Sequence, residues 1–192
     1  MSKVLIIYCH PNPKSFNHAV YGRLESELKK SHEVRTRDLY ALKFNPVLDG
    51  QDLGELQAGK VSADIAAEQA EILWADRLAF VYPLWWFGRP ALLKGYIDRV
   101  LSYGFAFEYG PNGGRGLLHH KKALVLMTTG TPEVILGTAQ NALPTSMRDG
   151  TLKFCGIQEV LWKSFDGVIA VSDADRHAML DEIPALAKTL VS

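Results

Sequence analysis

The stretch YPLWWFGRPALLKGYIDRVLSYGFAF, Tyr82–Phe107, decides the fold. It overlaps the apolar run Leu78–Tyr82, which is long enough for a strand buried on both faces and too short for an ordinary helix. After a turn at Gly88, Pro90 suits the first position of a helix, where its missing N–H leaves nothing unsatisfied. The stretch therefore predicts a buried strand, a loop and a helix in direct succession.

The helix expected after Pro90 has one apolar and one polar face. Apolar residues recur there at helical spacing, and charged residues fall between them. The apolar face comprises Leu93, Tyr96, Ile97, Val100 and Leu101, and the other face comprises Lys94, Asp98 and Arg99.

The loop between this strand and this helix is unusually aromatic. Pro83–Phe87 contains two tryptophans, a phenylalanine and a proline at the carboxyl end of a strand, where open α/β sheets bind ligands. Such a loop is ordinarily polar, and indole faces there suit stacking on a flat ring system. Ordinary core packing or a subunit interface would explain the same residues, so the loop alone leaves these alternatives open.

Length and charge limit the classes of protein to consider. The 192 residues suit a single domain spanning 1–192, and 21 basic residues balance 21 acidic ones. A net charge of zero gives no electrostatic footprint for nucleic acid or an anionic membrane. No signal-peptide pattern and no apolar run of membrane-spanning length is visible, so we expect a cytoplasmic protein without membrane insertion.

The two cysteines indicate neither a metal site nor a disulfide framework. Cys9 and Cys155 are not paired in a CxxC motif and have no histidines at ligand spacing. We expect both to be buried and inert, with Cys9 near the ligand edge as the possible exception.

The remaining chain alternates strands and helices. This alternation predicts a parallel sheet with helices on both faces. The further strands expected are Lys3–Tyr8, Glu33–Asp38 near the sheet edge, Lys122–Met127 and Glu159–Phe165. The further helices expected are one capped by Ser15 or Asn17 that carries Val20, Leu24 and Leu28, Ile65–Ala75 capped by Asp64, and a terminal helix capped by Asp173 with a kink or restart at Pro184.

Three segments are expected to be irregular. Leu39–Ala63 contains several turn signals and is interpreted as a loop. Tyr103–Lys121 is interpreted as a flexible aromatic loop, suited to a lid or to a dimer interface. Glu133–Gly156 is expected to form short helix and loop.

Two further loops are predicted to meet the aromatic loop at the same sheet edge. The first, HPNPKSFN, follows the first strand and opens a helix, whose N-terminus is a ready phosphate site to which His10, Ser15 and Asn17 can add bonds. Ser15 is equally well explained as an ordinary cap. The loop matches neither GxGxxG nor GxxxxGK[ST], which disfavours a dinucleotide fold and an NTPase. The second, TTGTP, follows the fourth strand.

These motifs together resemble a known family. HPNPKSFN, SADIAAEQ, YPLWWFGRPALLKGYIDRVLSYGFAFEYG, TTG and LKFCG resemble the NAD(P)H:quinone reductases of the DT-diaphorase type, from about Val4 to Gly156. The chain is also similar to smaller bacterial members, including ancillary subunits of glutathione-gated potassium efflux systems. The resemblance implies a flavodoxin-like, doubly wound α/β fold with a five-stranded parallel sheet of order 2-1-3-4-5. It also implies a homodimer and a noncovalent flavin at the carboxyl ends of the strands.

The resemblance implies roles for particular residues. NAD(P)H would reduce the flavin and leave before a quinone takes the hydride from the same face. Phe107 and Tyr109 match lid residues that close the partner subunit's site. The flavin-binding positions that match are His10, Ser15, Phe16, Asn17 and Ala19 for the phosphate and ribityl region, Pro83, Leu84, Trp85, Trp86 and Phe87 for the isoalloxazine, and Thr128, Thr129 and Gly130 for the second loop.

The chain departs from the family in two places. The family's catalytic tyrosine and histidine have no counterpart in Thr131–Met147, so the catalytic residues are unassigned and Tyr109 or His119 is a hypothetical substitute. The loop between Pro46 and Asp64 is shorter than the segment that helps to hold FAD in the mammalian enzymes, which leaves FAD against FMN open. NADH against NADPH and the physiological acceptor are open as well.

Three other functions compete with a flavin-dependent reductase. The first is a flavin-binding regulatory subunit of a potassium efflux system, acting through protein contact. The second is an electron-carrier flavodoxin, which the neutral charge and the HPNPKSFN loop disfavour. The third is a hydrolase on a similar scaffold, which the absence of GxSxG and of a P-loop disfavours.

Overall fold

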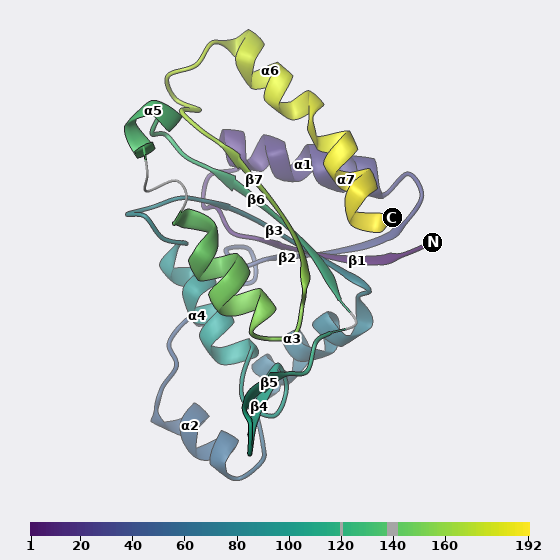
Figure 1. The fold of residues 1–192 in the computed structure, drawn as a ribbon, viewed down its shortest axis with the longest axis vertical. Helices are drawn as coiled ribbons and strands as arrows, with labels where there is room; N and C mark the ends of the chain where they lie inside the picture. The colour runs from purple at the N-terminus through teal and green to yellow at the C-terminus, as the bar shows by residue number, and fades with distance from the viewer. Residues whose placement is uncertain (120, 138–141) are drawn as a thin grey trace.

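A parallel sheet of five strands in the order β2-β1-β3-β6-β7 forms the centre of the molecule (Figure 1). The computed structural model describes residues 1–119, 121–137 and 142–192. The order confirms the predicted 2-1-3-4-5 arrangement, with β2 at an edge. The strands are β1 (Lys3–Tyr8), β2 (Glu33–Asp38), β3 (Arg77–Pro83), β6 (Lys122–Thr128) and β7 (Glu159–Phe165).

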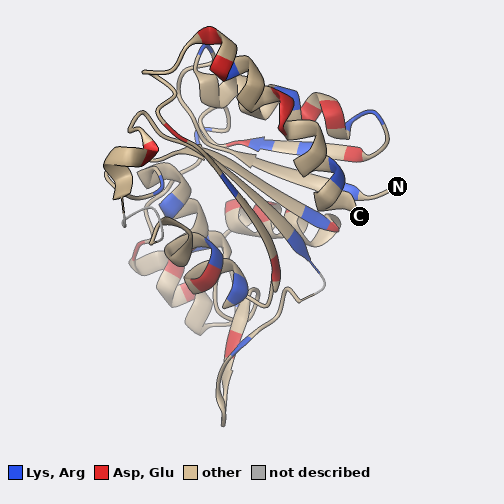
Figure 2. Ribbon diagram, turned by 45° about the horizontal axis from the view of Figure 1, so that its top comes forward, with Lys and Arg blue, Asp and Glu red and all other residues tan. Residues whose placement is uncertain are grey.

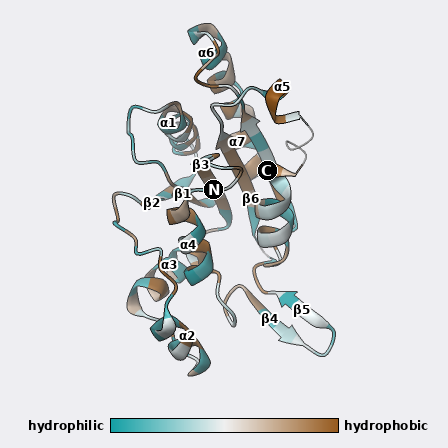
Figure 3. Cartoon of the chain, turned by 90° about the vertical axis from the view of Figure 1, so that its left-hand side faces the viewer, coloured by the Kyte–Doolittle hydropathy of each residue, from teal (hydrophilic) through white to brown (hydrophobic). Residues whose placement is uncertain are grey.

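Helices cover both faces of this sheet, as Figure 1 shows. Side chains of a strand alternate between faces, so Val4 and Ile6 of β1 enter one apolar core while Leu5 and Ile7 enter the other. The central strands are accordingly hydrophobic in Figure 3. The first core is covered by α1 (Phe16–Leu28), α6 (Asp173–Asp181) and α7 (Ile183–Val191), and the second by α3 (Ala63–Trp74) and α4 (Ala91–Val100).

The helix caps differ from the predictions in two of three cases. Ser15 caps α1 as predicted, and its hydroxyl accepts a hydrogen bond from His18 N at 3.1 Å. Ser62, and not Asp64, precedes α3. Ser172, and not Asp173, caps α6 in a capping box with Asp175. The terminal segment restarts as α7 at the position of Pro184, which was one of the two predicted outcomes.

A helix lies inside the segment that was predicted to be a loop. The helix α2 (Gly50–Gln57) begins after Asp49, whose carboxylate accepts from the backbone N–H groups of Gln51 and Asp52 at 2.9 and 3.0 Å. Two glycines within α2 conceal the helix in the sequence, because glycine is the weakest helix former after proline. Its stability therefore depends on tertiary contacts.

The main tertiary contact of α2 is an ion pair with α4. Arg99 was assigned to the polar face of α4, and this is wrong: its side chain is 4% exposed. Its guanidinium donates to the buried Asp52 at 2.7 Å and to Asp64 at 2.6 Å, and also to the Asn45 carbonyl at 3.0 Å. One arginine thus ties the segment before α2, α2 itself and the start of α3 to the sheet-covering helix α4.

The ion pairs of Arg99 make the free energy of unfolding depend on pH in the acid range. Arg99 holds the pKa of Asp52 below its ordinary value of 3.8, so the unfolded chain binds more protons than the folded chain at low pH. We expect the free energy of unfolding to be maintained above pH 3.8 and to fall as the pH drops below it. Urea unfolding between about pH 5 and 3 measures this slope. The Asp52→Asn variant should have a shallower slope, and an unaltered slope would contradict the assignment.

A small hairpin and two further helical elements complete the described secondary structure. The hairpin of β4 (Phe107–Gly110) and β5 (Gly113–Gly116) lies in the segment predicted to be a flexible loop, so that expectation is wrong in part. Gly116 packs against the backbone of Gly156, where a Cβ atom would overlap its neighbour. Between the hairpin and β7 lie β6, the short helix α5 (Glu133–Leu136) and a π-helix, η2 (Thr145–Lys153).

Positive and negative charges are mixed over the surface, and both cysteines lie in the interior. Figure 2 shows Lys and Arg interspersed with Asp and Glu over the helices. Both cysteines are buried and free, and burial raises the pKa of Cys9 to about 12 and that of Cys155 to about 11, which makes them inert and removes the exception considered for Cys9. Within the described residues, none of the helices has the length and apolar character needed to span a bilayer.

Candidate functional site

The three predicted loops meet at the carboxyl edge of the sheet. The backbone N–H of Leu84 donates to the Thr128 carbonyl at 2.7 Å, which joins the β3–α4 loop to the end of β6. The Asn17 Nδ2 donates to Thr128 Oγ1 at 3.0 Å, which joins the first turn of α1 to the same residue. We call this meeting point of the β1–α1, β3–α4 and β6–α5 loops the carboxyl-edge site.

The aromatic loop forms a tight turn of an unexpected kind. Trp85 and Gly88 exchange two backbone hydrogen bonds of 2.9 Å, and the two residues between them, Trp86 and Phe87, have φ values of 50° and 56°. Two positive φ values in such a turn define type I′, which normally contains Asn-Gly because larger residues are strained there. Strain of this kind persists at ligand sites, where function and not stability determines the backbone.

The side chains of this turn extend away from the core. Trp86 is fully exposed at 101%, and Phe87 is exposed at 64%. Burial therefore does not compensate for the strained backbone at either residue. Trp85 is less exposed and lies 5.9 Å from the His10 ring, measured between ring centroids, so the β1–α1 loop and the aromatic loop face each other. The turn presents apolar ring surface directly at the carboxyl-edge site.

Asn17 is buried and incompletely satisfied. Its side chain is 2% exposed, and its Oδ1 has no hydrogen-bond partner among the described residues. A buried carbonyl oxygen without a donor costs about 1–3 kcal/mol, so such atoms call for an explanation. A ligand hydroxyl at the carboxyl-edge site would supply the missing donor.

The first turn of α1 adds donors to the site. Ser15 already uses its hydroxyl to cap His18 N, whereas the N–H groups of Phe16 and Asn17 belong to the first turn and have no acceptor within the helix. His10 Nδ1 accepts from Asn12 N at 3.0 Å, and burial lowers the His10 pKa, which favours the neutral ring. The helix end and the exposed Lys14 are therefore the positive features of this loop.

The second loop is held rigidly by β7. Thr129 N–H donates to the Phe165 carbonyl at 2.9 Å, and Val168 N–H donates to the Thr129 carbonyl at 3.0 Å. Gly130 packs close under Ile169, because a Cβ atom on this glycine would lie 3.1 Å from the Ile169 Cδ1. Ile169 itself is largely exposed, so it adds an apolar side chain to the rim.

The other predicted binding residues differ in their exposure. Phe16 packs on Phe165 with 6.3 Å between ring centroids, and Pro83 is buried at the end of β3. Ala19 is exposed on the first turn of α1. The thirteen-residue set proposed for the cofactor thus lies on the three loops and their flanking turns, with some members supplying the walls and others the surface.

The predicted lid residues lie at the opposite end of α4. This helix begins at the carboxyl edge, so the hairpin that follows it emerges near the other edge (Figure 1). Phe107 contacts Tyr103, Tyr109 and Phe154 in a ring cluster, with 5.7 Å between the Phe107 and Tyr109 centroids. In the same region, the His119 Nδ1 forms a hydrogen bond with the Gly116 carbonyl. Within one chain these residues are not brought to the carboxyl-edge site.

The sequence reasoning missed Arg89. This residue closes the β3–α4 loop, and its guanidinium Nη1 donates to Ser146 Oγ at 3.2 Å, which links the loop to η2. The available signal was the motif itself, WWFGRP, in which one cation follows three large aromatic residues.

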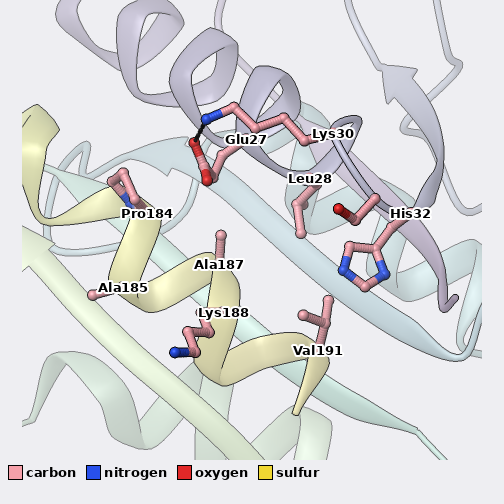
Figure 4. Close-up of a pocket in the computed structure, with 10 residues that line it drawn as sticks. Glu27, Leu28, Lys30, His32, Pro184, Ala185, Ala187, Lys188 and Val191 are labelled. Carbon is pink, nitrogen blue, oxygen red and sulfur yellow. Dashed lines mark hydrogen bonds and ion pairs between the residues drawn. The ribbon is translucent and has the colours of Figure 1, made fainter.

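A well-formed pocket of about 440 Å³ lies elsewhere, between the end of α1 and α7 (Figure 4). Leu28 and Ala187 form part of its wall, and Lys188 and His32 are polar lining residues. This position is at the amino edge of the sheet, away from the three loops. No buried side-chain polar atom without a hydrogen-bond partner belongs to its lining among the described residues, so its chemistry singles out no ligand.

The chain is similar to known proteins over most of its length. The chain matches the family described as "Flavodoxin-like fold" over residues 2–187. It is 37% identical over 182 residues to an "Uncharacterized NAD(P)H oxidoreductase" of Haemophilus influenzae, with 92% of this chain and 90% of that protein covered. It is 37% identical over 202 residues to the human "Ribosyldihydronicotinamide dehydrogenase [quinone]", with 93% and 87% covered.

A solved structure shares the whole architecture. The "NAD(P)H:quinone oxidoreductase from Methanothermobacter marburgensis" superposes with a TM-score of 0.89 at 31% identity, covering 100% of this chain and 98% of that one.

Proposed function

Because the chain belongs to the flavodoxin-like fold family, we propose that it is an NAD(P)H:quinone oxidoreductase that works through a noncovalently bound flavin. The single observation that carries the proposal is the type I′ turn, in which Trp86 and Phe87 adopt positive φ values and expose their rings. The relatives of this chain are described as oxidoreductases acting with NAD(P)H or on quinones, which supports the same reaction class.

The residues of the carboxyl-edge site suit both ends of a flavin. The aromatic turn offers a flat apolar surface for the ring system, and the backbone groups of Gly130 in the second loop suit its polar edge, because those of Thr129 are bonded to Phe165 and Val168. The unpaired Asn17 Oδ1 suits a hydroxyl of the ribityl chain. The free N–H groups at the start of α1 suit the phosphate.

The chemistry requires little of the protein beyond binding and orientation. A bound flavin would supply the two-electron step, accepting a hydride from NAD(P)H and passing two electrons to a quinone that also takes up two protons. The aromatic turn would orient the ring, while the rim residues Phe87 and Ile169 would exclude water from the side on which an apolar acceptor stacks. Donor and acceptor would use the same face in turn.

We also infer a homodimer, as the family resemblance implies. The ring cluster of Tyr103, Phe107, Tyr109 and Phe154 leaves Tyr103 and Tyr109 more than half exposed at the hairpin. An exposed aromatic cluster suits a subunit contact, and in a dimer it would be available to the partner's site. Tyr109 and His119 would take part in catalysis only through such a partner contact.

We also infer a reducing compartment, the cytoplasm, which suits two free buried cysteines. The three relatives named above are described as oxidoreductases and none of them as a transporter subunit, which favours an enzyme over a regulatory subunit of a potassium efflux system.

The direct test is the absorbance spectrum of the purified chain. We expect a yellow protein that releases FMN or FAD on denaturation, loses its colour with NAD(P)H and regains it with a simple benzoquinone. Chromatography of the released material decides between the two flavins. A correctly folded chain that stays colourless and takes up neither flavin when supplied would overturn the proposal.

The Trp86→Gly variant should change stability and cofactor binding in opposite directions. Glycine removes the strain of a positive φ, and the exposed indole contributes no buried area, so the free energy of unfolding of the flavin-free protein should rise by about 1 kcal/mol. Losing the stacking surface should raise the flavin dissociation constant roughly tenfold. Thermal unfolding and fluorescence titration measure the two effects.

The matched control is Leu73→Ala, which removes an exposed apolar side chain of α3. It should leave the flavin dissociation constant unchanged. A Trp86→Gly variant that binds flavin as the wild type does would show that the ring system lies elsewhere.

A further inference from the structure

Arg89 holds a partly buried positive charge beside the aromatic turn. Its Nη1 donates to Ser146 Oγ at 3.2 Å and contacts the Met147 sulfur at 3.7 Å, which fixes the guanidinium against η2. Its Nε is buried and has no acceptor among the described residues. The side chain is therefore anchored at one nitrogen and unsatisfied at another.

No carboxylate forms an ion pair with this charge within the part of the chain that the structure describes, and Asp98, which acts on it from a distance, is itself paired with Lys94. Arg99 is paired with Asp52, and Arg37 with Glu68, whereas Arg89 forms no ion pair among these residues. The residues outside the described ranges, 120 and 138–141, include neither Asp nor Glu. A partly desolvated charge without an ion-pair partner is costly, and burial accordingly lowers the Arg89 pKa.

The backbone increases this cost. Arg89 directly precedes Pro90, the N-cap of the ten-residue helix α4, and the first turn of α4 contains no acidic residue. A helix N-terminus carries a partial positive charge, so it repels a cation placed beside it. The positive charge of Arg89 and the partial positive charge of the α4 N-terminus thus lie together at the end of the strained Trp86-Phe87 turn. Both favour an anion at the carboxyl-edge site.

We infer that the Arg89 guanidinium stabilises the negative charge that the cofactor gains on reduction, and so makes the bound flavin easier to reduce. This inference rests on the function proposed above. Charged groups near the ring are among the means by which a protein tunes a flavin, and a partly desolvated charge acts more strongly than one in water. Ser146 is the positioning residue, because it holds the guanidinium by a hydrogen bond.

The test compares the affinities for oxidised and reduced flavin. Arg89→Met removes the charge and keeps much of the length, Arg89→Lys keeps the charge, and Arg148→Met is the matched control because Arg148 is already paired with Asp149 at 2.9 Å. FMN and FAD are titrated in both redox states, and the midpoint potential of the flavin that binds is measured. Circular dichroism checks that each variant is folded.

The expected result is specific to the reduced state. Arg89→Met should bind oxidised flavin within about twofold of wild type and reduced flavin about tenfold more weakly, which equals a drop of about 30 mV for a two-electron couple. Arg89→Lys should keep most of the wild-type potential, and Arg148→Met all of it. If Arg89→Met does not fold, Arg89→Lys together with Ser146→Ala carries the test, since Ser146→Ala should lower the potential by a smaller amount.

Several outcomes would overturn the inference. An unchanged flavin midpoint potential in folded Arg89→Met would do so. A change confined to the ratio of the KM for NADPH to that for NADH would do so as well, because it would assign Arg89 to the nucleotide phosphate. An unchanged potential with loss of the dimer would assign Arg89 to the subunit contact. A wild-type chain that binds neither flavin would refute the proposed function itself, which distinguishes that failure from an error about Arg89 alone.

Discussion

Replacing Arg99 by methionine is expected to lower the free energy of unfolding by about 3–5 kcal/mol. The guanidinium lies between the buried Asp52 and the half-exposed Asp64, at 2.7 and 2.6 Å. Methionine fills part of the space but removes the charge, so the Asp52 carboxylate loses its counter-ion while it remains buried. The loss should be large because Arg99 also holds the Asn45 carbonyl and thus the entry to α2.

Urea unfolding followed by circular dichroism measures this effect. The control is Lys94→Met on the same helix, because Lys94 pairs with Asp98 at 2.6 Å on the exposed face and should contribute at most about 0.5 kcal/mol. Adding Asp52→Leu to Arg99→Met should recover much of the loss, since an apolar pair replaces an isolated buried charge. A single variant as stable as the wild type would show that the buried pair is not what holds α2 in place.

Replacing Gly95 by alanine is expected to destabilise the protein by about 3 kcal/mol, although alanine is the better helix former. Gly95 faces the Pro46 backbone, and an alanine Cβ would lie 2.5 Å from the Pro46 Cα and closer still to its carbonyl oxygen. Backbone cannot rotate away as a long side chain can. The segment that Arg99 also holds would therefore be pushed off α4.

The control for this prediction is Gly22→Ala in α1. It makes the same chemical change inside a helix, but nothing lies within 4 Å of the added Cβ, so it should stabilise by roughly 0.5–1 kcal/mol. Thermal unfolding should therefore show opposite shifts, with Gly95→Ala melting roughly 6–12 °C below wild type. If Gly95→Ala melts at or above the wild-type temperature, Pro46 does not press on this helix in solution.

Short-range patterns were sufficient for the sheet and for the place of the site. The apolar runs of β1, β3 and β6 identify buried strands, and their alternation with helices implies parallel pairing. Because parallel strands end at one edge, the loops after them were predicted to meet, and the Leu84–Thr128 and Asn17–Thr128 hydrogen bonds show that they do.

The helix α2 was missed for a physical reason. Gly50 and Gly54 make its sequence a poor helix by propensity, and the Asp49 cap resembles an ordinary turn residue. The decisive contribution is the ion pair between Asp52 and Arg99, which are 47 residues apart. No window of neighbouring residues contains that information.

By itself, then, the amino-acid sequence determined the five parallel strands and the aromatic character of one loop, because each depends on residues close together in the chain, whereas the order of the strands was implied by the family resemblance. Only the tertiary structure decided that Arg99 is buried, that Trp86 and Phe87 form a strained turn, and that Arg89 has no counter-ion among the described residues. These three facts depend on which charges and backbone groups become neighbours after folding, and a charge in a sequence does not show its partner until the chain has closed around it.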